Sequence, residues 1–169
     1  ICKDTPFAEN PIFKEDKLHL SITFSCRYGS SALDLHYLCR AKKDKYIMSK
    51  QEVILCEELE SSLTTAIGTA HDKLFILTDE HTHRLCLPQL NNIPALKEAT
   101  EIIIGAEDVH KNLETLASVW QALSEKGATR HSLLINLGGG MVTDLGCFAA
   151  STFKRGIAYI NIPTTLLAM

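Results

Sequence analysis

The sequence lacks the features that mark membrane, secreted or nucleic-acid-binding proteins. No apolar run approaches the roughly 20 residues that span a bilayer, and the first residues lack the apolar block of a secretory signal. A formal net charge of -3 supplies no basic field to attract nucleic acid. We therefore expect a cytoplasmic protein with neither a membrane nor a nucleic acid as its partner.

Disulfide and metal motifs are lacking as well. The six cysteines are widely spaced and form no C-x-x-C pair, so we expect reduced thiols. The seven histidines form no H-E-x-x-H pattern, and the closest pair is His81 and His83. We interpret the histidines as solvated loop residues and predict no metal ligand within this sequence.

The character of the chain changes near Met48. Residues 1–47 are rich in turn-forming residues, and only the stretch from Leu18 to Phe24 alternates as a strand would, so we expect weak or peripheral structure there. With 169 residues and 46% apolar content, the chain is long enough for one domain with a real core. We assign residues 48–169 to that domain and leave residues 1–47 unassigned.

Strand-like and helix-like patterns alternate after Met48. Apolar runs typical of buried strands cover residues 52–56, 73–78, 101–104, 132–137 and 157–162, and helical spacing covers 59–70, 112–126 and 142–153. This alternation predicts an α/β fold, a Rossmann-like, mostly parallel sheet of five strands with flanking helices. One face of the second helix is expected to be core, and it carries Leu113, Leu116, Ala117, Trp120 and Leu123.

A glycine triplet, Gly138 to Gly140, joins a predicted strand to a predicted helix. Unpaired N–H groups at a helix N-terminus attract anions, and residues without Cβ let a pyrophosphate approach the backbone. The alternative is a tight turn with no ligand. The pattern is neither G-x-G-x-x-G nor a Walker motif. Asp144, one turn into the helix, could accept hydrogen bonds from nicotinamide or ribose, or could simply favour the helix dipole.

Several motifs in order resemble the 3-dehydroquinate synthase family. The stretch from Leu137 to Met169 contains the glycine triplet, an aspartate, a basic Arg-Gly element and Pro-Thr-Thr-Leu-Leu. Upstream, Asp108 to Thr115 resembles an acidic-x-x-Lys segment, and Leu77 to Glu80 resembles a Thr-Asp turn. The likeness covers residues 51–169.

The resemblance implies an enzyme that uses NAD to convert 3-deoxy-D-arabino-heptulosonate 7-phosphate into 3-dehydroquinate and phosphate, in the shikimate pathway. Such a lyase takes a small sugar-phosphate substrate, uses zinc or cobalt, and acts as a homodimer at full length. The family's NAD-binding positions correspond here to Asp79, His81, Asp108, Lys111, Gly139, Gly140, Met141, Asp144, Thr164, Thr165 and Leu167. Arg155 corresponds to an arginine that contacts substrate phosphate.

Three positions depart from the family pattern. His81 stands where asparagine is usual, Asp108 where glutamate is usual, and Thr143 where glycine is frequent. Without the resemblance, Asp79 reads as a turn residue, Lys111 as a solvated side chain and Arg155 as a surface charge. The family's zinc ligands and catalytic residues lie in a helical domain beyond the position of Met169, so the sequence predicts no catalytic residue here and no turnover by this chain alone.

Other functions stay open at this point. A related sugar-phosphate cyclase or a glycerol dehydrogenase-like NAD enzyme shares the glycine triplet and the downstream aspartate, although such dehydrogenases usually place a lysine soon after it, where Leu145-Gly146-Cys147 stand here. A nucleotide-binding module without turnover is the alternative of another kind. Residues 1–47 match no part of the family, and we expect them to be foreign to the enzyme, with Met48 as a natural start.

Overall fold

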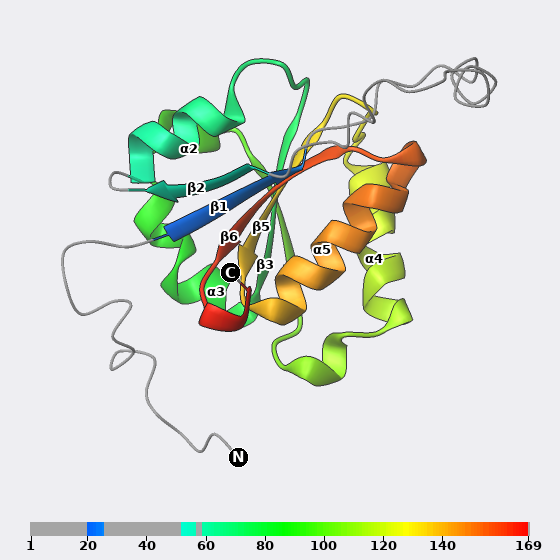
Figure 1. Ribbon diagram of the computed structural model, residues 1–169. Coiled ribbons are helices and arrows are strands. Elements are labelled where there is room, and N and C mark those ends of the chain that lie inside the picture. Colours follow the sequence, from blue (N-terminus) through cyan, green and yellow to red (C-terminus); the bar gives the residue numbers. More distant parts are fainter. Residues whose placement is uncertain (1–19, 26–51, 57–58, 169) are drawn as a thin grey trace, which may run out of the picture.

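A six-stranded sheet with helices on both faces forms the protein (Figure 1). The computed structural model describes residues 20–25, 52–56 and 59–168. Its strands are β1 (Leu20–Ser25), β2 (Glu52–Cys56), β3 (Leu74–Asp79), β4 (Thr100–Ile104), β5 (Leu133–Gly138) and β6 (Ala158–Pro163). All five strands predicted after Met48 are present, with ends within one residue of the expected ones.

The strand order is β2-β1-β6-β5-β3-β4. β4, β3, β5 and β6 are parallel, which confirms the predicted Rossmann-like architecture. The expected count of five strands was wrong, because β1 lies between β2 and β6 and pairs antiparallel with both. β1 comes from the leading segment, for which peripheral structure was expected, and it instead occupies an interior position in the sheet.

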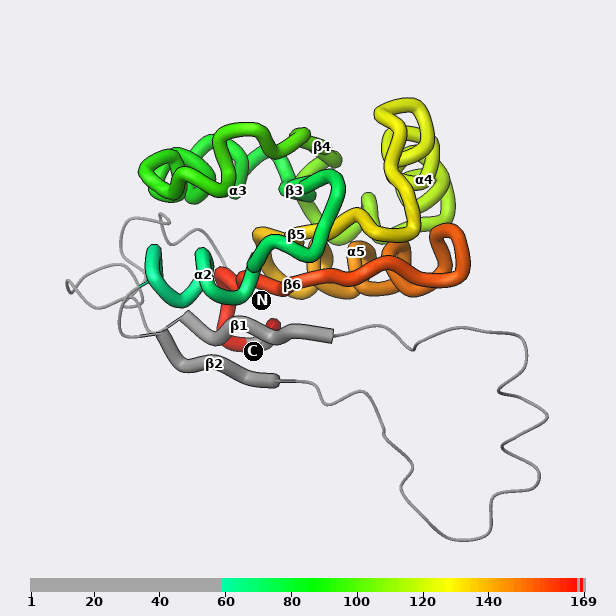
Figure 2. Tube along the Cα trace, turned by 90° about the horizontal axis from the view of Figure 1, so that it is seen from above, coloured from blue at the N-terminus to red at the C-terminus, as the bar shows by residue number. Residues whose placement is uncertain are grey.

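The helices form the two outer layers of a three-layer molecule (Figure 2). On one face lie α2 (Leu59–Ile67), α3 (Glu80–Leu85) and the 3-10 turns η3 (Leu87–Leu90) and η4 (Pro94–Leu96); on the other lie α4 (Leu113–Glu125) and α5 (Gly140–Thr152). The alternating side chains of β3 and β5 supply both apolar layers, which explains why these strands read as continuous apolar runs. No described helix is long and apolar enough to cross a membrane.

Helix α4 begins and ends as the sequence predicts, but its buried face differs in part. Asn112 caps it by accepting a hydrogen bond from the Thr115 N–H at 2.9 Å, and Gly127 takes a left-handed φ of 73° just past its end. Trp120 packs against the core as expected. Leu113, however, is 79% exposed and Ala117 is exposed as well, whereas Val119 is fully buried. The prediction that Leu113 is buried was wrong because Leu113 is the first residue of the helix, next to the loop that leads into it.

Candidate functional site

The predicted binding residues gather at one edge of the sheet. β3, β4, β5 and β6 run parallel, so their carboxyl ends share this edge. In open α/β sheets, ligands bind in the crevice outside the carboxyl ends of the strands. The segments that leave these four ends begin at Glu80, Gly105, Gly139 and Thr164. The order of strands therefore brings together segments that are up to about 85 residues apart in the sequence.

The glycine loop occupies the turn from β5 into α5. Gly139 is the N-cap residue of α5, and no side chain there accepts a hydrogen bond from the first turn. A Cβ at Gly138 would lie 2.6 Å from the Cβ of Val142, and one at Gly139 would lie 3.2 Å from Thr165 Cγ2. A Cβ at Gly140 would meet nothing within 4 Å. Two glycines are thus needed for packing inside the protein, while the third faces open space beside free helix N–H groups.

Two threonine hydroxyls lie beside this loop and are used differently. Thr143 Oγ1 donates to the carbonyl oxygens of Gly139 and Gly140, at 3.2 Å each. Thr164 is held by its own N–H, which donates to the Gly138 carbonyl at 2.9 Å, and its buried Oγ1 has no hydrogen-bond partner. A buried polar atom normally has a partner, so the unused Thr164 hydroxyl is a candidate contact for a polar ligand.

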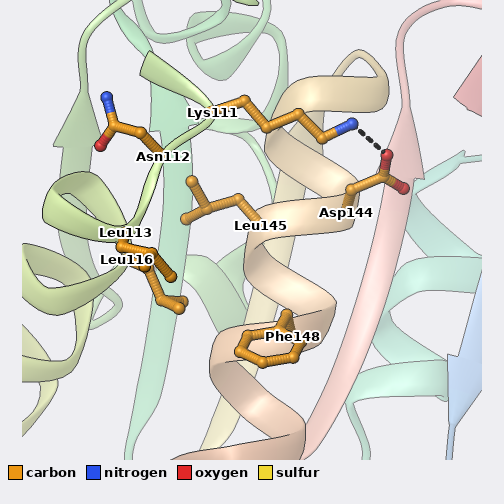
Figure 3. A pocket seen from close by; sticks show the side chains of 7 residues that line it. All are labelled: Lys111, Asn112, Leu113, Leu116, Asp144, Leu145 and Phe148. Atoms are coloured by element: carbon orange, nitrogen blue, oxygen red, sulfur yellow. Dashed lines mark hydrogen bonds and ion pairs between the residues drawn. The ribbon is translucent and has the colours of Figure 1, made fainter.

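Lys111 and Asp144 meet across the edge of the site (Figure 3). Lys111 precedes α4, Asp144 lies in the second turn of α5, and Lys111 Nζ is 2.7 Å from Asp144 Oδ2. The hydrogen bond and charge of Asp144, with a smaller contribution from the charge of Asp108, raise the pKa of Lys111. The ammonium therefore stays protonated at neutral pH, and the pair places one cation and one carboxylate next to the helix N-terminus.

An open cleft of about 320 Å³ continues from this ion pair between α4 and α5. Its walls are mainly apolar, and Leu113 and Phe148 are 79% and 53% exposed at its mouth (Figure 3). The lining side chains are Lys111, Asn112, Leu113, Leu116, Asp144, Leu145 and Phe148. The cleft offers apolar contact next to groups that can bind hydroxyls or charge.

The residues at the end of β3 lie at the same edge, and one of them caps the helix that follows. Asp79 caps α3: its Oδ1 accepts from the Thr82 N–H at 2.7 Å, while its own N–H donates to Thr82 Oγ1 at 3.1 Å. One carboxylate oxygen is therefore occupied by the cap. Asp79 has the structural role that its interpretation as a turn residue implies, and its other carboxylate oxygen is not used by the cap. His81 is exposed in the first turn of α3, and Asp108 is exposed in η5 (Asp108–His110).

Arg155 is the predicted site residue that its described surroundings do not bring to the glycine loop. Arg155 follows the far end of α5, about 20 Å along the helix axis from Gly140, at the edge where β6 begins. It lies in a left-handed turn with φ values of 46° at Lys154, 72° at Arg155 and 101° at Gly156. Leu167 belongs to η7 (Leu166–Ala168), and its side chain lies outside the described part of the structure. Met141 is half-buried in the first turn of α5, as expected for a residue next to the loop.

Sequence reasoning missed three residues at or near this edge. Glu107, just before Asp108, has φ 75° and ψ 158°, a conformation that a non-glycine residue rarely adopts. Thr78 Oγ1, at the end of β3, is buried without a partner. Asn136 is fully buried in β5. Asn136 and Thr78 had a signal, because Asn136 interrupts the apolar run of its strand and Thr78 belongs to the Thr-Asp turn that resembles the family.

Residues 101–169 match the model of the 3-dehydroquinate synthase N-terminal domain. The chain is 51% identical over 122 residues to the 3-dehydroquinate synthase of Parabacteroides distasonis, an alignment that covers 72% of this chain and 35% of the relative. It is 43% identical over 96 residues to the 3-dehydroquinate synthase of Thermococcus kodakarensis, covering 57% of this chain and 28% of the relative. The chain belongs to the 3-dehydroquinate synthase family. It spans about a third of the length of the first of these 3-dehydroquinate synthases.

Solved structures of sugar-phosphate cyclases share the fold of this 3-dehydroquinate synthase family member. A crystal structure of 2-deoxy-scyllo-inosose synthase superposes with a TM-score of 0.59 at 23% identity, covering 66% of this chain and 32% of that chain. The 2-epi-5-epi-valiolone synthase of Streptomyces hygroscopicus, solved with NAD+ and Zn2+ bound, gives 0.54 at 29% identity, covering 64% and 31%. These likenesses support the α/β architecture and the helices that flank the sheet.

Proposed function

We propose that this chain is the NAD-binding part of a 3-dehydroquinate synthase, which converts 3-deoxy-D-arabino-heptulosonate 7-phosphate to 3-dehydroquinate and phosphate in the shikimate pathway. The glycine loop carries this proposal. It combines a 13-residue helix whose N-terminus has no side-chain cap, the open space beside Gly140, and the unpartnered hydroxyl of Thr164. Such a site suits the pyrophosphate of a dinucleotide.

We propose roles for the surrounding residues that correspond to the family positions they match. Gly139, Gly140 and Met141 offer backbone N–H groups to the pyrophosphate, and Thr164 and Thr165 approach it from the end of β6. Lys111, with Asp108 next to it, binds ribose hydroxyls, and Asp144 accepts from nicotinamide or ribose. Asp79 and His81 face the adenosine end, and Leu167 completes the site. NAD, when bound, supplies the hydride acceptor of the reaction and returns the hydride at its end.

The solved relatives support the cofactors of this proposal. The 2-deoxy-scyllo-inosose synthase has also been solved with carbaglucose-6-phosphate, NAD+ and Co2+. We extend from these structures the use of NAD, of zinc or cobalt, and of a sugar-phosphate substrate. Among the described residues, no group of three His, Cys, Asp or Glu side chains is placed to hold a metal ion. We therefore propose that the metal and most of the chemistry belong to a helical domain of the whole enzyme, a homodimer in the cytoplasm.

We propose that Arg155 contacts substrate phosphate in a site that another part of the assembled enzyme completes. Its guanidinium follows the end of α5 that points away from the glycine loop, and its side chain is exposed. The left-handed turn that presents it is held by Lys154, whose Nζ donates to the Ala128 carbonyl at 2.6 Å. The described surroundings offer Arg155 no place in the NAD site itself.

Titration calorimetry of the 169-residue chain with NAD tests the proposal. We expect measurable binding, and we expect Gly140→Ala to weaken it at least tenfold without lowering the melting temperature. The added methyl group meets no protein atom and suits a helix, so any loss of affinity arises on the ligand side. The proposal fails if the wild type shows no binding at millimolar NAD, or if Gly140→Ala binds NAD as the wild type does.

The ion pair gives a second test of the same site. Lys111→Met and Asp144→Asn each remove one charge and keep the size of the side chain, and each should weaken NAD binding about tenfold if it removes one ligand contact. Lys97→Met, an exposed lysine of the η4 region, is the matched control and should change nothing. Equal affinities for all three variants would remove Lys111 and Asp144 from the proposed site. We also expect no formation of 3-dehydroquinate by this chain alone.

A further inference from the structure

A pair of asparagine side chains is buried beneath α5, in the middle of the parallel strands. Asn136 on β5 and Asn161 on β6 are direct neighbours in register, and Asn136 Nδ2 donates to Asn161 Oδ1 at 2.8 Å. Asn136 is fully buried and Asn161 is 9% exposed. The apolar layer on the same face of the sheet includes Leu134, Val142 and Ala149.

Both amides contact α5 directly. A Cβ at Gly146 would overlap the amide of Asn136, with Oδ1 as the nearest atom, so the absence of a side chain at Gly146 makes room for it. The next residue, Cys147, accepts a hydrogen bond from Asn161 Nδ2 at 3.1 Å. The amide pair therefore fixes two strands to one turn of the helix by contacts that depend on direction as well as distance.

This arrangement is costly for the core. Asn136 Oδ1 is buried with no hydrogen-bond partner, and an apolar pair of similar shape would avoid that penalty. The apolar part of the α5 contact combines Val142 and Leu145 with the small residues Gly146, Ala149 and Ala150. Hydrophobic contact is not directional, so by itself it opposes sliding only weakly. A buried polar pair is one means of selecting a single register in such an interface.

The position of α5 matters for the ligand site at its N-terminus. Gly146 is six residues from Gly140, about 9 Å along the axis, and only two residues from Asp144. The helix is continuous from Gly140 to Thr152, so a shift at Gly146 is carried along the helix to its first turn. Building on the proposed NAD site, we propose that Asn136 and Asn161 are positioning residues, which hold the N-terminal amides of α5 and the Asp144 carboxylate in place for the dinucleotide.

The double variant Asn136→Leu/Asn161→Leu separates positioning from stability. Leucine places two methyl groups where asparagine places Oδ1 and Nδ2, and it removes the unpaired oxygen. We expect a melting temperature equal to or above that of the wild type, a tenfold or larger rise in the Kd for NAD, and changed backbone amide chemical shifts at Gly139 and Gly140. Leu123→Met, in the same apolar layer but on α4, is the control and should leave affinity and both shifts unchanged.

Gly146→Ala decides the question if the double variant does not fold. Its methyl group pushes α5 away from the Asn136 amide while both asparagines stay, so the same loss of affinity and the same shift changes are expected. A folded variant with unchanged NAD affinity and unchanged Gly139 and Gly140 shifts would overturn the positioning role. If the wild type binds no NAD, the proposed function is wrong. The positioning role is then tested only by whether the Gly139 and Gly140 amide chemical shifts change in the variants.

Discussion

Glu107 holds a backbone conformation that belongs to glycine. Its φ of 75° and ψ of 158° place it in a region where a side chain costs about 1–3 kcal/mol. Glu107→Gly should therefore raise the free energy of unfolding by about 1 kcal/mol, after the greater freedom of glycine in the unfolded chain is subtracted. Urea denaturation measures the change. The same substitution at Glu114, an exposed residue in the first turn of α4, should lower stability by about 1 kcal/mol; losses at both positions would show that Glu107 is unstrained.

Asp72 connects stability to pH at the opposite edge of the sheet. Desolvation acts to raise its pKa, but hydrogen bonds from Thr129 and Ser132 outweigh it and hold the pKa of Asp72 below its usual value. Because the folded pKa is the lower one, this contribution to stability is present above about pH 4 and is lost as the pH falls through the folded pKa. The contribution is small, about 1 kcal/mol, since the side chain is exposed.

Asp72→Asn tests this linkage. The variant should be less stable than the wild type at pH 7, and the two unfolding curves should converge near pH 2, where the wild-type carboxylate is protonated as well. Thermal unfolding followed by circular dichroism over that pH range measures the difference. A constant gap between the two proteins from pH 7 to pH 2 would show that the hydroxyl contacts do not depend on the charge of Asp72.

Among the elements, α4 couples its own stability to the site. Asn112 Oδ1 accepts from the Thr115 N–H, and Asn112 Nδ2 donates to the Val109 carbonyl at 2.9 Å, so one side chain fixes both the helix start and the loop that carries Lys111. Asn112→Ala should cost about 1 kcal/mol of unfolding free energy and should weaken NAD binding by freeing Lys111. Asn112→Asp keeps the cap but loses the Nδ2 hydrogen bond to Val109, so it should retain the stability of the helix and still weaken NAD binding. Thermal melts measure the stability of both variants, and calorimetry measures their affinity for NAD. Wild-type NAD affinity in Asn112→Ala would show that Asn112 does not affect the proposed site.

The sequence predicted these elements where local pattern decides the structure. β3 and β5 are apolar on both faces because helices cover both, and such runs are recognisable by length and β-branched content. The cap at Asn112 and the glycine at 127 mark the two ends of α4. Leu113 and Val119 show the limit of periodicity: which face of a helix is buried depends on how the helix lies on the sheet, and this is a tertiary property that spacing alone does not contain.

At the scale of the whole molecule, the candidate site residues were predicted from the family resemblance, and only the glycine loop had further support from its strand-to-helix context. The order of the parallel strands was not predicted, and it brings the loops at Asp79, Asp108 and Gly139 to one edge of the sheet. Arg155 could not be placed in this way, because the length and direction of α5 put it at the other edge. The Lys111–Asp144 pair was not predicted either, since it depends on how closely α4 approaches α5.

Strand β1 decides how the leading segment belongs to the molecule. Thr23 lies between Val53 of β2 and Asn161 of β6, so its backbone N–H faces a neighbouring strand on either side. Thr23→Pro removes that donor from the interior of a sheet and should lower the free energy of unfolding by at least about 1–3 kcal/mol.

Thr23→Val is the matched control, because it keeps the backbone N–H and a β-branched side chain, and urea denaturation of both variants measures the loss. If Thr23→Pro unfolds as the wild type does, β1 contributes nothing to the folded sheet, and residues 1–47 lie outside the domain as first supposed. A loss confined to Thr23→Pro would show instead that residues 20–25 are part of the same cooperative unit as the proposed NAD site, since β6 pairs with β1 and leads into Thr164 beside the glycine loop.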